Sequence, residues 1–171
     1  MNIILKLGKK IVSWIDLQRV IRNPRDIKFV KEQTEKICLT AVRLNPFALV
    51  DIREQTEEIC VEAVKQDGVV LSYVKEQTPR ICLAAVRNDP FALEYVKEQN
   101  EEMCLMAVMR NPYTICFVKE QTEEICLSAV WRNPLALMHI RKEYQTPRIC
   151  KEAIKGNEHV RKYVKIDLEE N

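Results

Sequence analysis

The sequence predicts an all-α fold, an α-solenoid of about six helix-turn-helix repeats of 22 residues with degenerate repeats at both ends. Three observations support this prediction. Nearly the same string occurs three times, as VKEQTEKICLTAV at 30–42, VKEQTPRICLAAV at 74–86 and VKEQTEEICLSAV at 118–130. Two signals that start helices recur in each repeat. Five cysteines follow one another at intervals of 22 residues, namely Cys38, Cys60, Cys82, Cys104 and Cys126.

The chain is expected to form one domain, residues 1–171. Lysines interrupt the apolar segment 1–14, MNIILKLGKKIVSW, which argues against a signal peptide. We interpret this segment as an N-terminal capping helix in preference to a membrane-surface anchor. Residues 15–165 hold the tandem repeats, and residues 166–171 form a tail. No run of about 18 apolar residues occurs, so neither a membrane span nor a membrane partner is expected.

Each repeat is predicted to contain two short helices with almost no loop between them. The first begins at a pair such as Asn45-Pro46, in which asparagine caps the helix and proline takes the first helical position. Asp89-Pro90 is an equivalent start. Helices of about eight to ten residues are marginal alone, so stacking on neighbouring repeats must stabilise them. The second helix begins after a capping threonine, at Thr34, Thr56, Thr78, Thr122 and Thr146.

The repeats at the two ends depart from this pattern, as expected of caps on an array. Asp16 stands where the first, degenerate repeat should have its cysteine. The last repeat begins near Ile149, two residues late, because RKEYQT replaces KEQT. It keeps Asn157 but lacks the proline that should follow.

The recurring cysteine is interpreted as a small apolar side chain in a narrow, buried position. Equivalent positions on stacked helix pairs should lie about 8–10 Å apart, beyond the ~7 Å limit for a disulfide. The sequence has no CxxC motif and no Cys/His cluster with zinc spacing, so no metal and no cofactor are expected. Reduced thiols are typical of the cytoplasm, which is the predicted location.

A glutamine precedes the second helix of each repeat. At 100° per residue its side chain points toward the apolar arc. We expect each amide to bind the carbonyl groups left unpaired at the end of the first helix and so to hold the tight turn. These residues are Gln33, Gln55, Gln77, Gln99 and Gln121.

The strings LAAVRNDPFALEYV at 83–96 and VEAVKQDGVVLSYV at 61–74 resemble a family of tandem repeats of unknown function, with the pattern L-A-A-V-x-x-N-G-x-A-L-x-Y. The resemblance covers about residues 15–165, although proline replaces the family's glycine in most repeats. Such repeats occur in intracellular bacteria, large DNA viruses and parasitic genomes. The resemblance implies an all-α array with an interaction role, acting inside a host cell. It supplies no catalytic residue.

No catalytic constellation interrupts the repeats, so we expect the protein not to be an enzyme. His139 takes the aromatic position of its helix, where a packed or half-buried ring is expected, and His159 is expected to face solvent. The sequence has no glycine-rich phosphate loop and no nucleophile with a base at a recognisable spacing.

Variable outward positions indicate where a partner would bind. Exposed tryptophan and methionine are typical of protein interfaces, and arginines beside them would form a polar rim. The leading prediction is a non-enzymatic scaffold that binds another protein or protein complex. The resemblance implies a narrower form, an effector or inhibitor that binds and blocks a host or competing complex. The candidate residues are Met106, Met109, Arg110, Cys116, Trp131, Arg132 and Met138.

A row of basic residues supports an alternative function, nucleic-acid binding along the phosphate backbone. Adjacent glutamates and a net charge of only +2 weaken its positive field, so a solvated face with weak ion pairs is favoured. A homo-oligomer formed through the methionine and tryptophan residues is a third alternative. The basic row consists of Lys31, Arg53, Lys75, Lys97, Lys119 and Arg141.

Overall fold

The computed structural model describes residues 3–168 of the chain. Within that range it contains seven α-helices, eight 3-10 helices and no strand. The α-helices of the repeats alternate with 3-10 helices at the period that the cysteines predict, so the all-α solenoid fold is confirmed. The chain forms two compact units, Met1–Asn88 and Asp89–Asn171.

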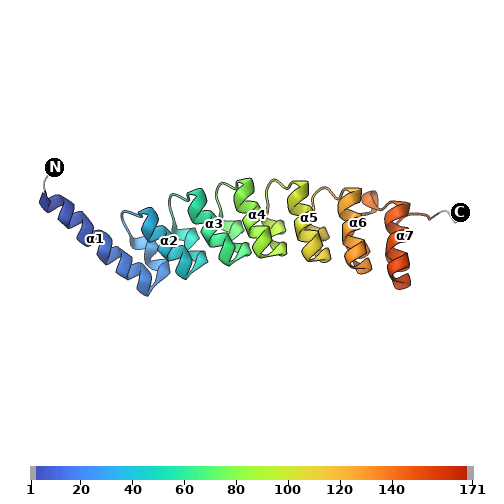
Figure 1. Cartoon of the computed structure of the whole chain (residues 1–171), viewed down its shortest axis with the longest axis horizontal. Coiled ribbons are helices and arrows are strands. Elements are labelled where there is room, and N and C mark those ends of the chain that lie inside the picture. The colour runs from blue at the N-terminus through green and yellow to red at the C-terminus, as the bar shows by residue number, and fades with distance from the viewer. Residues whose placement is uncertain (1–2, 169–171) are drawn as a thin grey trace. The chain divides into compact units, whose positions relative to one another are not determined.

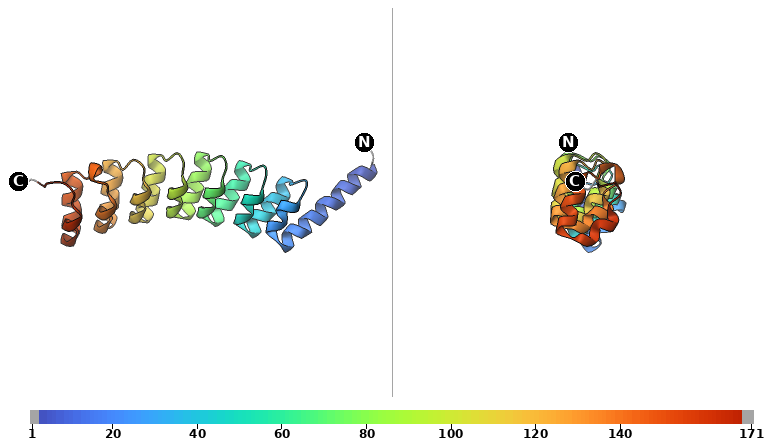
Figure 2. Two further views of the ribbon diagram at one scale, coloured as in Figure 1. Left: turned by 180° about the vertical axis from the view of Figure 1, so that it is seen from behind. Right: turned by 90° about the vertical axis from the view of Figure 1, so that its right-hand side faces the viewer.

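The first unit contains one long helix followed by three repeats. In Figures 1 and 2, α2, α3 and α4 stand side by side, and α1 is inclined to them. The elements are α1 (Ile3–Arg22), η1 (Pro24–Phe29), α2 (Glu35–Leu44), η2 (Pro46–Asp51), α3 (Glu57–Gln66), η3 (Gly68–Tyr73) and α4 (Pro79–Asn88).

The second unit repeats the same alternation, and α5, α6 and α7 again stand side by side. A short extra helix, η7, accommodates the two additional residues of RKEYQT. The elements are η4 (Pro90–Tyr95), α5 (Glu101–Arg110), η5 (Pro112–Phe117), α6 (Glu123–Arg132), η6 (Pro134–His139), η7 (Lys142–Tyr144), α7 (Pro147–Gly156) and η8 (Glu158–Tyr163).

The predicted segment boundaries at the two ends differ from those observed. The expected capping helix, 1–14, is continuous with the helix of the degenerate repeat in which Asp16 stands at the cysteine position, and together they form α1. Residues 1–2 lie outside the described part of the chain. In the predicted tail, 166–168 form no regular helix, and 169–171 are not described.

The first helix of each repeat is shorter and tighter than predicted. It is a six-residue 3-10 helix, as in η2, in place of an α-helix of eight to ten residues. Asn45 starts it, because its side chain accepts a hydrogen bond from the Phe47 amide at 3.0 Å. Bonds to the third preceding residue follow, such as Ala48 N to Asn45 O at 2.9 Å. The chain then turns into an extended segment at Ile52, with φ −84° and ψ 124°.

Each repeat buries its apolar residues between its α-helix and the neighbouring 3-10 helices. In the second unit Ile125, Cys126 and Ala129 of α6 are buried, and so are Ala136 and Leu137 of η6. Fully burying a side chain the size of isoleucine or leucine contributes about 1.5–3 kcal/mol, and each repeat supplies several. The fold therefore has two layers, the α-helices and the 3-10 helices, which share this core.

The five cysteines at 22-residue intervals and Cys150, the equivalent residue of the last repeat, are here called the cysteine ladder. All six are free thiols and are buried, as the sequence predicts. Each thiol lies near a glutamine: Cys150 Sγ donates to Gln145 Oε1 at 3.6 Å, and Cys126 Sγ donates to the Gln121 carbonyl oxygen at 3.4 Å. Burial raises the pKa of Cys126 to about 12. A thiol with so high a pKa is a poor nucleophile at neutral pH, which fits a structural role.

The glutamine side chains bind backbone groups as expected, and they also join neighbouring repeats. Gln33 Nε2 donates to the Ile27 carbonyl of its own repeat at 2.9 Å and to the Asp51 carbonyl of the next repeat at 3.0 Å. Its Oε1 accepts the Arg53 amide of that next repeat at 2.9 Å. The same three-bond arrangement recurs at Gln55, Gln99, Gln121 and Gln145, and Gln145 makes a fourth bond, to the Ile140 carbonyl.

Gly156 ends α7 at a point of close approach to η6. A Cβ on this residue would lie 2.6 Å from Pro134 Cγ, nearer than real Cβ contacts allow. The last repeat can therefore dock closely on the preceding 3-10 helix because glycine stands at this position.

The helix caps differ in strength, which gives a first prediction. The Asn100 side chain accepts a hydrogen bond from the Met103 amide at 2.9 Å, whereas Thr34 makes no side-chain cap bond at the start of α2. Asn100→Ala is therefore expected to lower the free energy of unfolding by about 1 kcal/mol, and Thr34→Ala by less than about 0.3 kcal/mol. Urea titration of both variants measures the difference, and equal losses would contradict the prediction.

Candidate functional site

At two places along the chain, a side chain five residues after a recurring cysteine binds a glutamate two residues after the cysteine of the next repeat. In the first unit Arg43 Nε of α2 donates to Glu62 Oε1 of α3 at 2.8 Å. In the second unit Trp131 of α6 takes the place of Arg43, and its indole Nε1 donates to Glu152 Oε2 of α7 at 2.9 Å.

Trp131 is both exposed and held in place. Its relative exposure is 60%, so most of its surface is open to solvent. The bond to Glu152 restricts the orientation of the indole, because the carboxylate accepts its only N–H group. A large aromatic side chain whose orientation is already fixed loses little conformational entropy when a partner covers it.

The methionines of α5 lie beside this tryptophan. Met109 occupies the position equivalent to Trp131 and is 54% exposed. Met106, one turn earlier on the same helix, is half-buried. Since α5 packs directly against α6, Met109 and Trp131 belong to adjacent helices of one surface. We call Met106, Met109 and Trp131 the Met/Trp surface.

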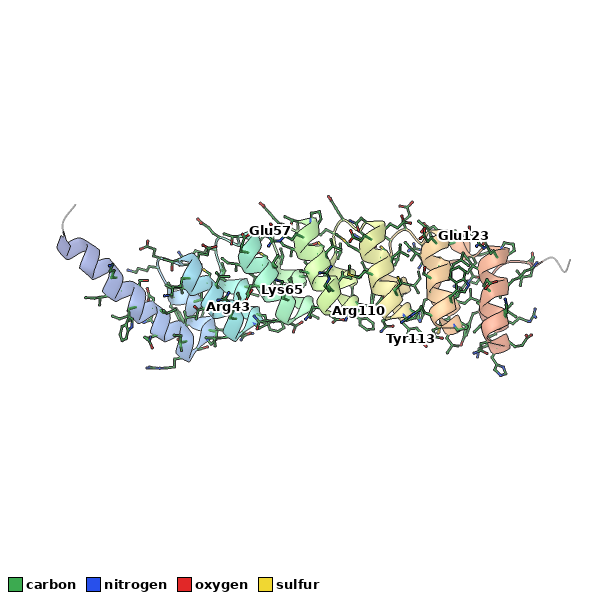
Figure 3. The ribbon with its side chains drawn as sticks, viewed as in Figure 1. Arg43, Glu57, Lys65, Arg110, Tyr113 and Glu123 are labelled. Carbon is green, nitrogen blue, oxygen red and sulfur yellow. The ribbon has the colours of Figure 1, made fainter. Side chains whose placement is uncertain are left out.

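Exposed arginines follow the Met/Trp surface at the ends of its two helices. Arg110 and Arg132 are the last residues of α5 and α6, and both are exposed. Figure 3 marks Arg110 at the C-terminal end of α5, with Tyr113 just beyond it. These are the two arginines for which the sequence predicts a polar rim.

Cys116 and Met138 do not belong to the Met/Trp surface. They are exposed residues of η5 and η6, in the 3-10 layer. Ile115 and Leu137 precede them and are completely buried toward the α-helical layer. The exposed side of the 3-10 layer therefore faces away from the α-helices. The sequence grouping combined residues of two different surfaces, because a list of outward positions does not show which layer each belongs to.

Edge-to-face aromatic pairs join neighbouring 3-10 helices, a feature that the sequence analysis did not identify. Tyr113 and His139 form one pair, with ring centroids 5.7 Å apart and planes at 86°. His139 is thus packed and half-buried, as its aromatic position predicts. The sequence feature that could have revealed these pairs is the recurrence of aromatic residues at two positions of each repeat. The other pairs are Phe47 with Tyr73 and Phe91 with Phe117.

The basic row makes specific contacts with the backbone. The Arg53 side chain donates a hydrogen bond to the Val30 carbonyl, and the Lys75 side chain donates one to the Ile52 carbonyl at 3.3 Å. The basic groups therefore satisfy carbonyls of the preceding repeat, a role that the sequence analysis did not anticipate. Contacts to the preceding member of the row are Arg53 to Lys31 O at 3.0 Å, Lys75 to Arg53 O at 2.8 Å, Lys119 to Lys97 O at 2.5 Å and Arg141 to Lys119 O at 2.5 Å.

Two shallow cavities occur at equivalent places, where the extended segments meet the α-helices. One, of about 270 Å³, is lined by residues that include Gln99, Cys104 and Lys119. The other, of about 260 Å³, is lined by residues that include Arg53 and Glu76. Each cavity contains acidic and basic side chains, and neither contains a histidine. Their residues repeat the structural pattern and do not form a nucleophile-base pair.

A family model described as "Domain of unknown function (DUF4116)" matches residues 79–122, from the start of α4 to the cap of α6. This match and the repeated helix pairs indicate a repeat family of unknown function. No curated protein and no solved structure matches the chain. In the described range 3–168, no helix is long and apolar enough to cross a membrane.

Proposed function

We propose that the protein is a non-enzymatic scaffold that binds another protein through the Met/Trp surface of α5 and α6. The observation that carries the proposal is Trp131, which is 60% exposed and yet held by Glu152. Interface residues that dominate affinity are often tryptophans surrounded by further contacts that exclude water. Met109 and Met106 supply adaptable apolar contacts, and Arg110 and Arg132 supply charged groups at the edge.

The basic row is a less favoured binding surface. Arg53, Lys75, Lys119 and Arg141 donate hydrogen bonds to carbonyl groups of the preceding repeat, so binding phosphates would require them to give up those bonds. A nucleic-acid complex would also weaken steeply with salt, whereas a complex centred on apolar residues would not. We therefore keep nucleic-acid binding as the alternative outcome of the test below.

The Trp131→Ala variant is expected to lose about 30-fold in affinity for the partner, because truncating a dominant interface residue costs about 2 kcal/mol or more. The partner is first recovered by affinity capture from lysate of the native cell or its host, and binding is then measured by calorimetry with the purified partner. Met138→Ala is the control, because Met138 is also an exposed large apolar residue but lies in the other layer.

Equal retention of the partner by Trp131→Ala and wild type would contradict the proposal. Loss with both variants would point to a surface that includes the 3-10 layer. Recovery that nuclease abolishes and salt weakens would favour the basic row. Inhibition of a host or competing complex is the narrower form of the proposal, and it is tested by adding the protein to the activity assay of the recovered complex.

A further inference from the structure

Among residues 10–22, whose side chains the structure describes, helix α1 packs on the repeats through one face. Val20 is completely buried, and Ser13, Asp16 and Leu17 are half-buried. These residues are spaced by three, one and three positions, so they lie on one side of the helix. Since α1 packs against α2 and η1, this side is the one that joins the first unit.

The opposite face of α1 carries an apolar stripe that the fold does not cover. Ile11, Trp14 and Ile15 are 56%, 62% and 48% exposed. At 100° per residue, the mean direction of these three side chains lies about 160° from that of the packed face. We call these three residues the α1 stripe. In Figure 1 this part of α1 extends away from α2–α4, so no neighbouring helix of the first unit covers it.

Positive charge is concentrated on the same helix. Its 20 residues include five basic residues and one acidic residue. The whole chain holds 27 basic and 25 acidic residues, so 22 basic and 24 acidic residues remain outside α1. Lys10, Arg19 and Arg22 are exposed, and they lie before and after the stripe along the helix. The single acidic residue, Asp16, lies on the packed face and leaves these cations unpaired on their own helix.

We propose that α1 lies on the surface of a membrane that contains anionic lipids. An amphipathic helix with an apolar stripe and flanking cations places its stripe among the acyl chains and its cations among the head groups. Trp14 fits this boundary, because an indole has a large apolar body and one polar N–H group. The sequence predicts no membrane partner, because it has no run long enough to span a membrane and its N-terminal segment is interpreted as a cap. A helix that lies on a membrane surface needs no spanning run, and the exposure of the stripe removes the second reason.

Charge also favours an anionic membrane over a second copy of the chain as the partner of the α1 stripe. Pairing two α1 helices through their stripes would bring Lys10, Arg19 and Arg22 of both copies together. Anionic head groups would neutralise the same three cations. The structure therefore favours a lipid surface over self-association.

The test is sedimentation of the 171-residue protein with large vesicles, either of phosphatidylcholine alone or with phosphatidylserine added. Binding is expected only to the vesicles that contain phosphatidylserine. The double variant Trp14→Ser/Ile15→Ser should lose at least about tenfold in vesicle binding, and Lys10→Gln/Arg22→Gln should lose about as much. Leu44→Ser/Val50→Ser is the matched control, because it removes two similarly exposed apolar residues outside α1 and should bind like wild type.

Absence of wild-type binding to the anionic vesicles would overturn the proposal, and so would an equal loss in the control variant. Sedimentation equilibrium without lipid supplies a second measurement. A wild-type dimer that Trp14→Ser/Ile15→Ser converts to monomer, together with no vesicle binding, would assign the stripe to self-association. Circular dichroism of every variant must first match that of the wild type, so that a loss of binding is not a loss of fold.

Discussion

Replacing Gln121 by leucine is expected to lower the free energy of unfolding by about 4 kcal/mol, since three buried or part-buried backbone groups would lose a hydrogen bond. Gln121 is 1% exposed. Its Nε2 donates to the Ile115 carbonyl at 2.8 Å and to the His139 carbonyl at 3.3 Å. Its Oε1 accepts the Arg141 amide at 2.9 Å. Leucine has a similar size but cannot make any of these bonds, and each unpaired group costs about 1–3 kcal/mol.

Urea titration followed by circular dichroism measures this effect, with Glu120→Leu as the control. Glu120 is the exposed neighbour of Gln121, so the control also introduces a leucine, but outside the bonding site. The control is expected to change the free energy of unfolding by no more than about 0.5 kcal/mol. Similar titration curves for the two variants would show that the glutamine bonds contribute little to stability.

Alkaline pH is expected to destabilise the protein strongly through the cysteine ladder. Burial raises the pKa of Cys60 and Cys104 to about 11 and that of Cys126 to about 12, from 9.0. Folding therefore favours the neutral thiol, whereas the unfolded chain ionises above about pH 9. The stabilisation is complete below that pH and is lost as the pH rises toward the folded-state pKa values. Between about pH 8 and pH 10, these three thiols together should remove about 4 kcal/mol.

The measurement is the free energy of unfolding at several pH values in the presence of a reductant that does not titrate in this range. The triple variant Cys60→Ala/Cys104→Ala/Cys126→Ala is the comparison. It should be less stable near neutral pH, because it loses buried volume. Its stability should nevertheless fall less steeply above about pH 9. Parallel pH profiles for the variant and the wild type would mean that the thiols do not cause the alkaline loss.

The recurring residues of the sequence predict the fold well, because each of them has the same local role in successive repeats. The Asn-Pro pairs start the 3-10 helices, and Cys38, Cys60 and their equivalents are buried as their 22-residue spacing implies. The glutamine bonds within a repeat also follow from local geometry. The glutamine bonds to the next repeat do not follow from local geometry, because they depend on how closely that repeat approaches. The bond from Gln33 to the Asp51 carbonyl is an example.

Other features depend on arrangement in space and could not be predicted. Over six residues, an apolar pattern with three residues per turn and one with 3.6 look alike, so the 3-10 helices were taken for α-helices. The candidate binding residues were divided between two layers, because assigning Met138 and Trp131 to one surface requires the relative orientation of η6 and α6. Segment 1–14 was interpreted as a capping helix, since an apolar helix face alone does not show whether anything covers it.

The glutamine and basic side chains connect each repeat to the backbone of its neighbour, and backbone groups are the same whatever the side chains are. Lys75, for example, binds two carbonyl oxygens, so the identity of the residues that bear them is unimportant. A gene segment that encodes one repeat could therefore be duplicated or deleted without matching changes in the adjoining segments. Arrays of different length could arise by such events, while the outward positions of each copy diverge under selection for different partners.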